Sequence, residues 1–228
     1  MLYVVGTPIG NLDDLSLRQA KTILSSDIIL AEDTRSAQTL INYIKNAYKL
    51  PTASYKLISY YRDNEFEKLP QVLQWLTDGK KVSLISESGM PLISDPGLLL
   101  IKSVIKKNVP FIVVPGPTAV TTALIYSGFN PKHFLFLGFF PKKSSEINSL
   151  IKQLIEINKI IPKTVFVFYE SPKRINNALQ IIGSSLPDAD LAVCRELTKK
   201  FEQVVHGKAK DIEKQNYRGE LVVVMKLQ

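Results

Sequence analysis

Residues 81–97, "KVSLISESGMPLISDPG", are the stretch that says most about the fold of this chain. The apolar run 81–85 has the length and composition of a buried strand. The twelve residues after it contain three serines, two glycines, two prolines and two carboxylates. In open α/β sheets, ligands bind outside the carboxyl ends of parallel strands. A stiff, acidic loop directly after a buried strand therefore predicts an α/β fold with a binding site at that edge of the sheet.

The same pattern of a short apolar run followed by a polar segment recurs along the whole chain. Between most of these runs lie amphipathic stretches such as 15–26 and 65–76, and Pro70 predicts a kink or a late start in the second. This alternation indicates an α/β protein with largely parallel strands. The predicted strands are 2–5, 27–31, 56–60, 81–85, 111–114, 134–138, 164–169, 191–196, 202–207 and 220–227.

The second half of the chain differs from the first in the spacing of its strands. Toward the C-terminus the strands lie closer together with less helix between them, which favours antiparallel pairs and a mixed sheet. The segment "VVPGPTAV" (113–120) interrupts the pattern with two prolines and a glycine. We therefore expect two α/β domains, 1–115 and 116–228, with a cleft between them.

Composition narrows the class of protein. The 29 Lys and Arg residues against 21 Asp and Glu give a net charge of +8, which favours anionic partners such as nucleic acid, although exposed lysines also simply solvate a surface. No apolar run is long enough for a membrane span, and the start "MLYVVGTPIG" reads as a buried strand. The single cysteine, Cys194, excludes an intramolecular disulfide and fits the cytoplasm.

Several common sites are excluded because their motifs are missing. The chain has no Walker phosphate loop, no H-E-x-x-H and no C-x-x-C, and His133 and His206 have no neighbouring ligands, so no metal site is predicted. The loop "GTPIGN" (6–11) is not a Rossmann glycine motif, because its proline removes one amide donor. It forms a stiff turn, with Asp14 or Ser16 as the cap of the next helix.

Five polar loops follow predicted strands, at 31–35, 86–97, 115–119, 169–174 and 195–202. We expect them to converge on one site. Each also has a purely structural explanation. Ser171 with Pro172 suits a helix start, and Asp95-Pro96-Gly97 suits a turn into a helix.

Six motifs resemble one known family, in order and over essentially the whole chain. They are "VVGTPIGNLDDLSLRQAKTILSSDIILAEDTR", "PLISDPG", "VPGPTAV", "FYESPKR", "RELTKKFEQVVHG" and "RGELVVV". The sequence resembles the ribosomal RNA small subunit methyltransferase I family of the tetrapyrrole (corrin/porphyrin) methylase superfamily. The resemblance implies S-adenosylmethionine bound in the interdomain cleft, a homodimer, and 2′-O-methylation of a cytidine ribose in small-subunit (16S) ribosomal RNA.

The loop 86–97 departs from the family pattern S-D-A-G-T-P-L-I-S-D-P-G in its first half. Glu87 replaces an aspartate, Ser88 an alanine and Met90 a threonine. Glu87 keeps the charge, whereas Met90 replaces a hydroxyl by a thioether and is expected to lose a hydrogen-bond partner.

The cofactor needs acceptors for its ammonium and ribose diol, and small residues where backbone approaches closely. Glu87 and Gly89 supply these, Pro8 and Ile9 form a ledge, and Thr118 and Ala119 open a helix. The resemblance implies that the second domain adds Tyr169, the 196–198 segment and the edge at 219–220. The full predicted cofactor set is Pro8, Ile9, Glu87, Ser88, Gly89, Met90, Ile93, Thr118, Ala119, Tyr169, Glu196, Leu197, Thr198, Gly219 and Glu220.

A ribose hydroxyl is a poor nucleophile until its proton leaves, so a general base would help. Asp33, Glu170 and Glu196 are the candidates. Each has an alternative explanation as an ion pair with a neighbouring arginine, namely Arg35, Arg174 or Arg195.

Basic residues near the predicted cleft form the candidate RNA-binding set. "FFPKKSSE" (139–146) adds a basic loop beside Phe139 and Phe140, which suit either base stacking or the sheet's core. The predicted RNA-binding residues are Arg35, Lys142, Lys143, Arg174, Arg195, Lys199 and Lys200.

Two other functions remain open from the sequence. The fold also suits a methylase of a small tetrapyrrole-like substrate, although the net charge favours RNA. From a different class, the chain could be a non-catalytic RNA- or ribosome-binding protein on the same scaffold, and Glu87 and Met90 keep that alternative open.

Overall fold

The computed structural model describes residues 1–228 and divides into two compact units, Met1–Thr118 and Ala119–Gln228. The division falls three residues after the predicted boundary, at the first residue of helix α5 (Ala119–Ser127). None of the helices combines the length and apolarity that a membrane crossing requires.

The first unit is built on a five-stranded sheet in the order β3-β2-β4-β1-β5, and every pairing in it is parallel. The carboxyl ends of all five strands therefore lie at one edge of the sheet. Its elements are β1 (Leu2–Val5), η1 (Leu12–Asp14), α1 (Leu17–Leu24), β2 (Ile28–Ala31), α2 (Thr34–Tyr48), β3 (Lys56–Ser59), α3 (Glu65–Thr77), β4 (Val82–Ile85), α4 (Leu98–Lys106) and β5 (Phe111–Val114).

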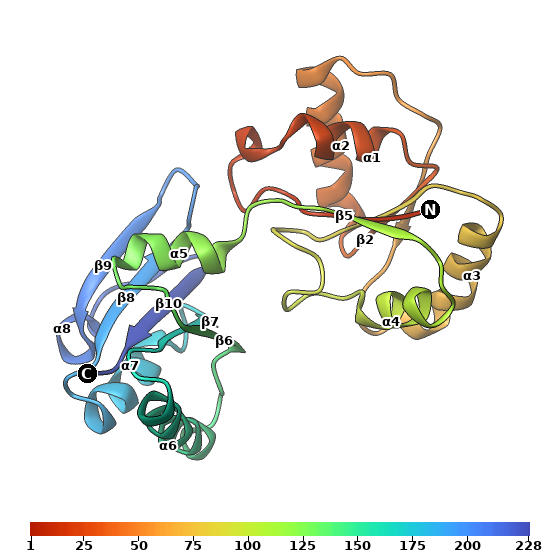
Figure 1. Ribbon diagram of the computed structural model, residues 1–228. Coiled ribbons are helices and arrows are strands. Elements are labelled where there is room, and N and C mark those ends of the chain that lie inside the picture. The colour runs from red at the N-terminus through yellow and green to blue at the C-terminus, as the bar shows by residue number, and fades with distance from the viewer. The chain divides into compact units, whose positions relative to one another are not determined.

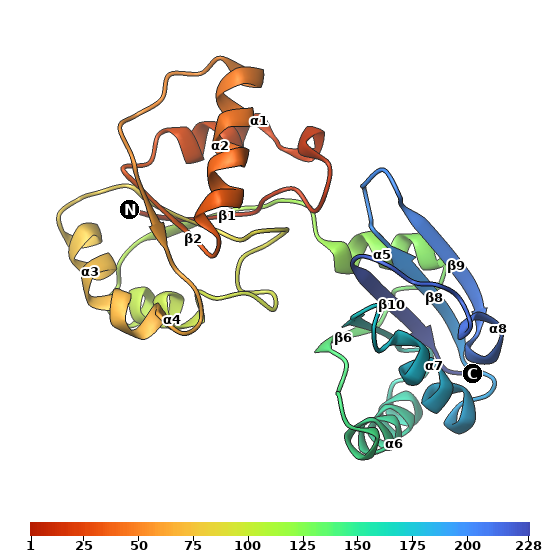
Figure 2. The same ribbon diagram turned by 180° about the vertical axis from the view of Figure 1, so that it is seen from behind.

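Helices cover both faces of this sheet, as Figures 1 and 2 show. One hydrophobic cluster joins α1 and α2 to strand residues such as Val5, Ile29 and Ile85. A second joins α3 and α4 to Val4, Leu30 and Leu84, which point to the opposite face because side chains alternate along a strand. Burial on both faces explains why β1, β2 and β4 are nearly uninterrupted apolar runs.

Of the helix starts predicted in this unit, one is confirmed and one is wrong. Ser16 caps α1 in a capping box with Gln19, as predicted for one of the two candidate caps. Helix α3 already begins at Glu65, five residues before Pro70, so the predicted late start is wrong. The buried Glu65 carboxylate accepts the Leu99 and Leu100 N–H groups at 2.9 and 3.2 Å, and so caps α4 from another helix.

The second unit has a mixed sheet in the order β6-β7-β10-β8-β9, where only β6 and β7 pair in parallel. The antiparallel pairing predicted for the C-terminal strands is thus confirmed. After α5, the elements are β6 (Phe134–Phe139), α6 (Ser144–Ile160), β7 (Val165–Glu170), α7 (Ile175–Ser185), β8 (Asp190–Arg195), β9 (Gln203–Lys208), α8 (Ala209–Ile212) and β10 (Leu221–Lys226).

The two faces of this sheet are covered unequally. Helices α6 and α7 pack with Phe166, Phe168 and Val223 in one large cluster, whereas α5 lies over β8 and β10 on the other face, as both ribbon views show. Helix α7 begins at Ile175 with Arg174 at the N-cap position, so Ser171 does not cap it. The fold class predicted from the sequence, α/β with a parallel first sheet and a mixed second sheet, is confirmed.

Candidate functional site

Three loops of the first unit meet at the carboxyl ends of β1, β4 and β5, and we call residues 6–9, 86–90 and 114–117 the three-loop junction. Thr7 and Gly89 form an antiparallel bridge, with Thr7 N–H donating to the Gly89 carbonyl at 2.8 Å and Gly89 N–H to the Thr7 carbonyl at 3.2 Å. Gly6 N–H donates to the Val114 carbonyl at 3.0 Å. Two of the five loops predicted to converge, 86–97 and 115–119, therefore meet here, together with the loop after β1, which was not among the five.

Two glycines allow the loops of the junction to approach so closely. A Cβ on Gly6 would collide with the Met90 sulfur and the Gly116 backbone, and a Cβ on Gly116 would collide with the Gln19 amide. That amide donates to the Gly6 carbonyl at 2.6 Å. Backbone contacts of this kind leave no room for any other residue.

Met90 does not lose its hydrogen bond, contrary to the prediction from the sequence. Gly116 N–H donates to the Met90 Sδ at 3.3 Å, because the flexible thioether reaches across the junction. Met90 is a weaker acceptor than a hydroxyl, but it also fills the space next to Gly6. Met90, although it departs from the family pattern, therefore links loop 86–90 to loop 114–117.

The other predicted cofactor residues of the first unit divide by exposure. Pro8 and Ile9 are buried, and Ile9 contacts the position where Gly89 lacks a side chain. Glu87, Ser88 and Ile93 are exposed, and Glu87 accepts a hydrogen bond from the Ser36 hydroxyl at 3.2 Å. Glu87, Ser88 and Ile93 therefore offer a carboxylate, a hydroxyl and an apolar side chain beside the hydrogen-bonded backbone of the junction. Thr118 ends the first unit and Ala119 opens the second.

Asp95, which the sequence suggested only as a turn residue, is an unusual carboxyl group. Burial, together with the neighbouring carboxylates of Glu32 and Glu87, raises its pKa to about 7. The three acids follow β2 and β4, which are neighbours in the sheet. In the sequence, this cluster is visible only as acids in the two loops that follow the strands 27–31 and 81–85. The structure contains no group of three or more His, Cys, Asp or Glu side chains arranged to hold a metal ion.

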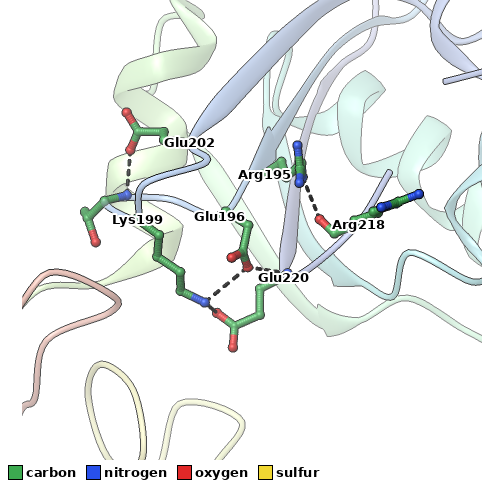
Figure 3. Close-up of polar contacts among 7 residues, drawn as sticks. Arg195, Glu196, Lys199, Glu202, Arg218 and Glu220 are labelled. Atoms are coloured by element: carbon green, nitrogen blue, oxygen red, sulfur yellow. Dashed lines mark hydrogen bonds and ion pairs between the residues drawn. The ribbon is translucent and has the colours of Figure 1, made fainter. Parts of the chain in front are cut away.

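In the second unit, residues 195–202 together with 218–220 form a structure that we call the charged arch (Figure 3). Glu196 N–H donates to the Glu220 carbonyl at 2.9 Å, and Glu220 N–H donates back to Glu196 Oε1 at 2.8 Å. Lys199 Nζ joins both carboxylates, at 3.1 Å from Glu196 and 2.9 Å from Glu220. Gly219 is required because a Cβ there would collide with the Glu196 carboxyl group.

The backbone of the charged arch is strained at two residues that are not glycine. Glu196 and Thr198 have φ values of 48° and 65°, in the left-handed region that such residues rarely adopt. Thr198 N–H donates to the Glu202 carboxylate at 2.5 Å, and that carboxylate also accepts from Tyr126 at 2.6 Å. The Thr198 hydroxyl is buried without a hydrogen-bond partner. Strain that surrounding contacts hold in place is typical of functional sites.

The three base candidates differ in their surroundings. Asp33 caps α2, and its hydrogen bonds and ion pair with Arg35 lower its pKa to about 2. The backbone N–H of Glu220 is the largest influence lowering the pKa of Glu196. Burial raises the pKa of Glu170, which accepts from Ser171 N–H at 2.6 Å and pairs with Arg174 at 2.5 Å. The expected arginine partners are present for Asp33 and Glu170, whereas Glu196 pairs with Lys199.

The predicted RNA-binding cations also separate into two groups. Arg174, Arg195 and Lys199 are held by contacts inside the second unit, Arg195 through the Arg218 carbonyl at 2.7 Å. The remaining cations are exposed, although two pair with acids at the surface: Arg35 with Asp33 and Lys143 with Glu146. This exposed set is Arg35, Lys142, Lys143 and Lys200.

Comparison with known proteins agrees with this architecture. Residues 1–213 match the family model for Tetrapyrrole (Corrin/Porphyrin) Methylases. Ribosomal RNA small subunit methyltransferase I of Thermotoga maritima is 38% identical, covering 98% of this chain and 97% of the relative. The protein of the same name from Hydrogenobaculum sp. is also 38% identical, covering 98% of this chain and 94% of the relative.

Among solved structures, diphthine synthase superposes with a TM-score of 0.70 over 98% of this chain and 88% of that chain. At 13% identity, this likeness concerns the fold alone.

Proposed function

The chain belongs to the tetrapyrrole (corrin/porphyrin) methylase family and within it to the ribosomal RNA small subunit methyltransferases I, and we propose that it 2′-O-methylates a cytidine of small-subunit ribosomal RNA. It is therefore an S-adenosylmethionine-dependent methyltransferase whose substrate is ribosomal RNA. The observation that carries the proposal is the near full-length similarity to these rRNA methyltransferases. The ribose, the cytidine and the roles of single residues are our inference.

The residues present fit the cofactor. Gly6 and Gly116 let the three-loop junction close, and Glu87 stands exposed beside it as an acceptor for an ammonium or a diol. In the second unit, the buried Thr198 hydroxyl has no hydrogen-bond partner and is available to a ligand. Each unit supplies part of the predicted cofactor set.

Bound S-adenosylmethionine would supply an electrophilic methyl group and leave as a neutral thioether, which needs no protonation. The chain's own task is then to hold a ribose oxygen in line with that methyl group. Orientation of this kind is worth up to roughly 7–11 kcal/mol. Such orientation requires a rigid binding surface. Backbone hydrogen bonds fix both the junction and the arch.

Asp95 is the group best suited to take the proton of the ribose hydroxyl. A base works best with a pKa near the working pH, and the pKa of Asp95 is about 7. A carboxylate with a pKa near 2, such as Asp33, is a much weaker base. Glu170 and Glu196 are committed to hydrogen bonds that hold Arg174 and the charged arch. We assign these two to positioning the loops.

The net charge of +8 supports RNA as the substrate, because exposed cations attract phosphates. Arg35, Lys142, Lys143 and Lys200 are the exposed cations that we assign to this task.

We also propose that the protein is a homodimer and acts in the cytoplasm. Sedimentation velocity of the purified chain tests the dimer.

A methyl-transfer assay tests the substrate. Purified protein is incubated with radiolabelled S-adenosylmethionine and, in separate reactions, small ribosomal subunits, naked ribosomal RNA and a precorrin. The proposal predicts label in the RNA of one or both ribosomal reactions and none in the precorrin. Label in the precorrin alone would replace RNA by a tetrapyrrole substrate, and cofactor binding without any transfer would indicate a non-catalytic scaffold.

A further inference from the structure

The edge strand β6 carries a row of aromatic side chains on one face of the second sheet. Phe134, Phe136 and Phe139 pair in register with Val165, Val167 and Tyr169 of β7, so all of them point to the same face. We call Phe134, Phe136, Phe139 and Tyr169 the aromatic strip. It lies on the face of the sheet that carries α5. Helix α5 packs mainly against β8 and β10, and less against β7.

A β-bulge creates this arrangement. The register between β6 and β7 shifts between Phe136 and Phe139, where Gly138 has a φ of 69°. In a regular strand, residues 136 and 139 would point to opposite faces, but the bulge brings both to one face. The next residue, Phe140, returns to the core and stacks on Phe168 at 4.2 Å. The bulge therefore directs one phenylalanine out of the core while its neighbour stays inside.

The exposed rings are held in place rather than loose. Tyr169 meets Phe136 and Phe139 edge to face, with ring centroids 5.0 and 5.4 Å apart. Phe139 nevertheless keeps 63% of its surface exposed, and Phe134 keeps 47%. An ordered, exposed aromatic surface is characteristic of binding sites.

The charged residues on either side of β6 indicate which kind of ligand the aromatic strip would bind. Lys132 precedes β6, and Lys142 and Lys143 follow it, all exposed. Two acids flank the strip: Glu146 pairs with Lys143 at 3.4 Å, which leaves Lys132 and Lys142 as its uncompensated cations, and the buried Glu170 pairs with Arg174. Aromatic faces between cations match single-stranded nucleic acid, since bases stack on the rings and phosphates meet the cations.

We propose that the aromatic strip is a stacking platform for an unpaired base of the substrate RNA, with Phe139 as its principal contact. The inference rests on the proposed function and adds to it the surface that receives the RNA. It assigns Phe139 to substrate binding and not to catalysis. Lys142 holds an adjoining phosphate.

Three substitutions at one position separate stacking from simple apolar contact. Phe139→Ala and Phe139→Leu should each weaken binding of a short single-stranded RNA about 5- to 100-fold, whereas Phe139→Trp should retain it. Phe66→Ala is the matched control, because Phe66 is 81% exposed on α3 of the other unit. Binding of a fluorescein-labelled oligonucleotide is followed by anisotropy in the full chain.

Salt dependence provides the second readout. Phe139→Ala should leave the slope of log affinity against log salt unchanged, whereas Lys142→Ala should reduce its magnitude by about 1. Equal affinities of the wild type and Phe139→Ala would overturn the proposal, as would equal affinities of the leucine and tryptophan variants. A change of oligomeric state in Phe139→Ala, seen by sedimentation, would instead make the strip a protein interface and equally overturn it.

Failure of the stacking platform and failure of the proposed function can be told apart. Calorimetry with S-adenosylhomocysteine measures cofactor binding separately, which reveals any effect that reaches the predicted cofactor residue Tyr169 through its contact with Phe139. If the wild type transfers no methyl group to ribosomal RNA yet binds RNA in a Phe139-dependent way, the proposed function fails and the stacking platform stands. If transfer occurs with equal efficiency in Phe139→Ala, the platform fails and the function stands.

Discussion

The three-loop junction and the charged arch both hold loops in place at strand ends, but the junction does so through backbone contacts and the arch through charged side chains. The junction uses the absence of side chains: Gly6 and Gly116 let backbones touch, and Gly89 adopts a φ of 83° that favours glycine. The arch uses side chains, since Glu196 and Lys199 tie two segments together through charged hydrogen bonds. The comparison teaches that the junction should be sensitive to added bulk and insensitive to salt, whereas the arch should be sensitive to the loss of its charges and, at Gly219, also to bulk.

The largest expected effect concerns the acid beside the junction. Asp95→Asn removes the proposed base while keeping nearly the same shape, so kcat should fall about 10²- to 10⁴-fold. Affinity for S-adenosylhomocysteine should stay within a few-fold. Single-turnover methyl transfer to small-subunit RNA measures the first quantity and calorimetry the second.

Asp63→Asn is the matched control, because Asp63 is an exposed aspartate of the same unit. Full activity of Asp95→Asn would remove Asp95 as the base.

Bulk added to the junction tests the glycine half of the comparison. Gly6→Ala should cost about 1–3 kcal/mol of unfolding free energy, because its Cβ would meet backbone that cannot move aside. It should also weaken cofactor binding. Urea unfolding and calorimetry measure the two effects.

Gly79→Ala serves as the control, since its Cβ would meet nothing within 4 Å and only its left-handed φ is disfavoured. If both variants lose the same stability and neither changes cofactor affinity, close backbone approach is not what builds the junction.

Charge removal tests the arch. Glu196→Ala should cost about 1–2 kcal/mol of unfolding free energy, because it leaves the Glu220 N–H without its acceptor. Glu196→Gln keeps an acceptor and should cost less than about 1 kcal/mol. Glu146→Gln, which breaks an exposed pair with Lys143, should cost almost nothing. A series in which the three losses are equal would mean that the arch is not held by its carboxylate.

The smallest expected effect is on the pH dependence of stability. The pKa of Asp95 is raised from 3.8 to about 7 in the folded chain, so the folded state binds its proton more tightly than the unfolded state. The contribution of Asp95 to stability is therefore complete below about pH 4 and is lost as pH rises to about 7. Partial exposure limits this loss to on the order of 1 kcal/mol.

Asp95→Asn should remove that component, which chemical unfolding at pH 5 and pH 8 would reveal as a smaller difference than in the wild type. An unchanged difference would show that Asp95 ionises normally. Activity has the opposite sign, because a base must be deprotonated. Methyl transfer should therefore rise with pH through about 7.

Most of the fold could be predicted because each sheet leaves a clear pattern in the sequence. Strands β1, β2 and β4 are apolar runs because helices bury both of their faces, and all ten predicted strands exist within one or two residues. Helix starts were harder. The cap of α7 was misplaced because Ser171-Pro172 forms a turn, whose Ser171 carbonyl accepts from Arg174 and Ile175 before the helix begins.

The candidate site was only partly accessible from the sequence. The meeting of loops 86–97 and 115–119 could be predicted, since parallel strands place their carboxyl ends at one edge, whereas the part played by loop 6–9 was missed. The acceptor role of Met90 could not, because it depends on the distance between two loops far apart in the chain. The same holds for Asp95, whose pKa depends on Glu32 and Glu87 in three dimensions, and for Phe139, whose exposure depends on a bulge.

The most direct test of the central claim is the identity of the methylated nucleoside. Small-subunit RNA from the methyl-transfer reaction, prepared with deuterated S-adenosylmethionine, is digested to nucleosides and analysed by mass spectrometry. The account predicts label in 2′-O-methylcytidine. Label on a base-methylated nucleoside, or in no nucleoside at all, would contradict it.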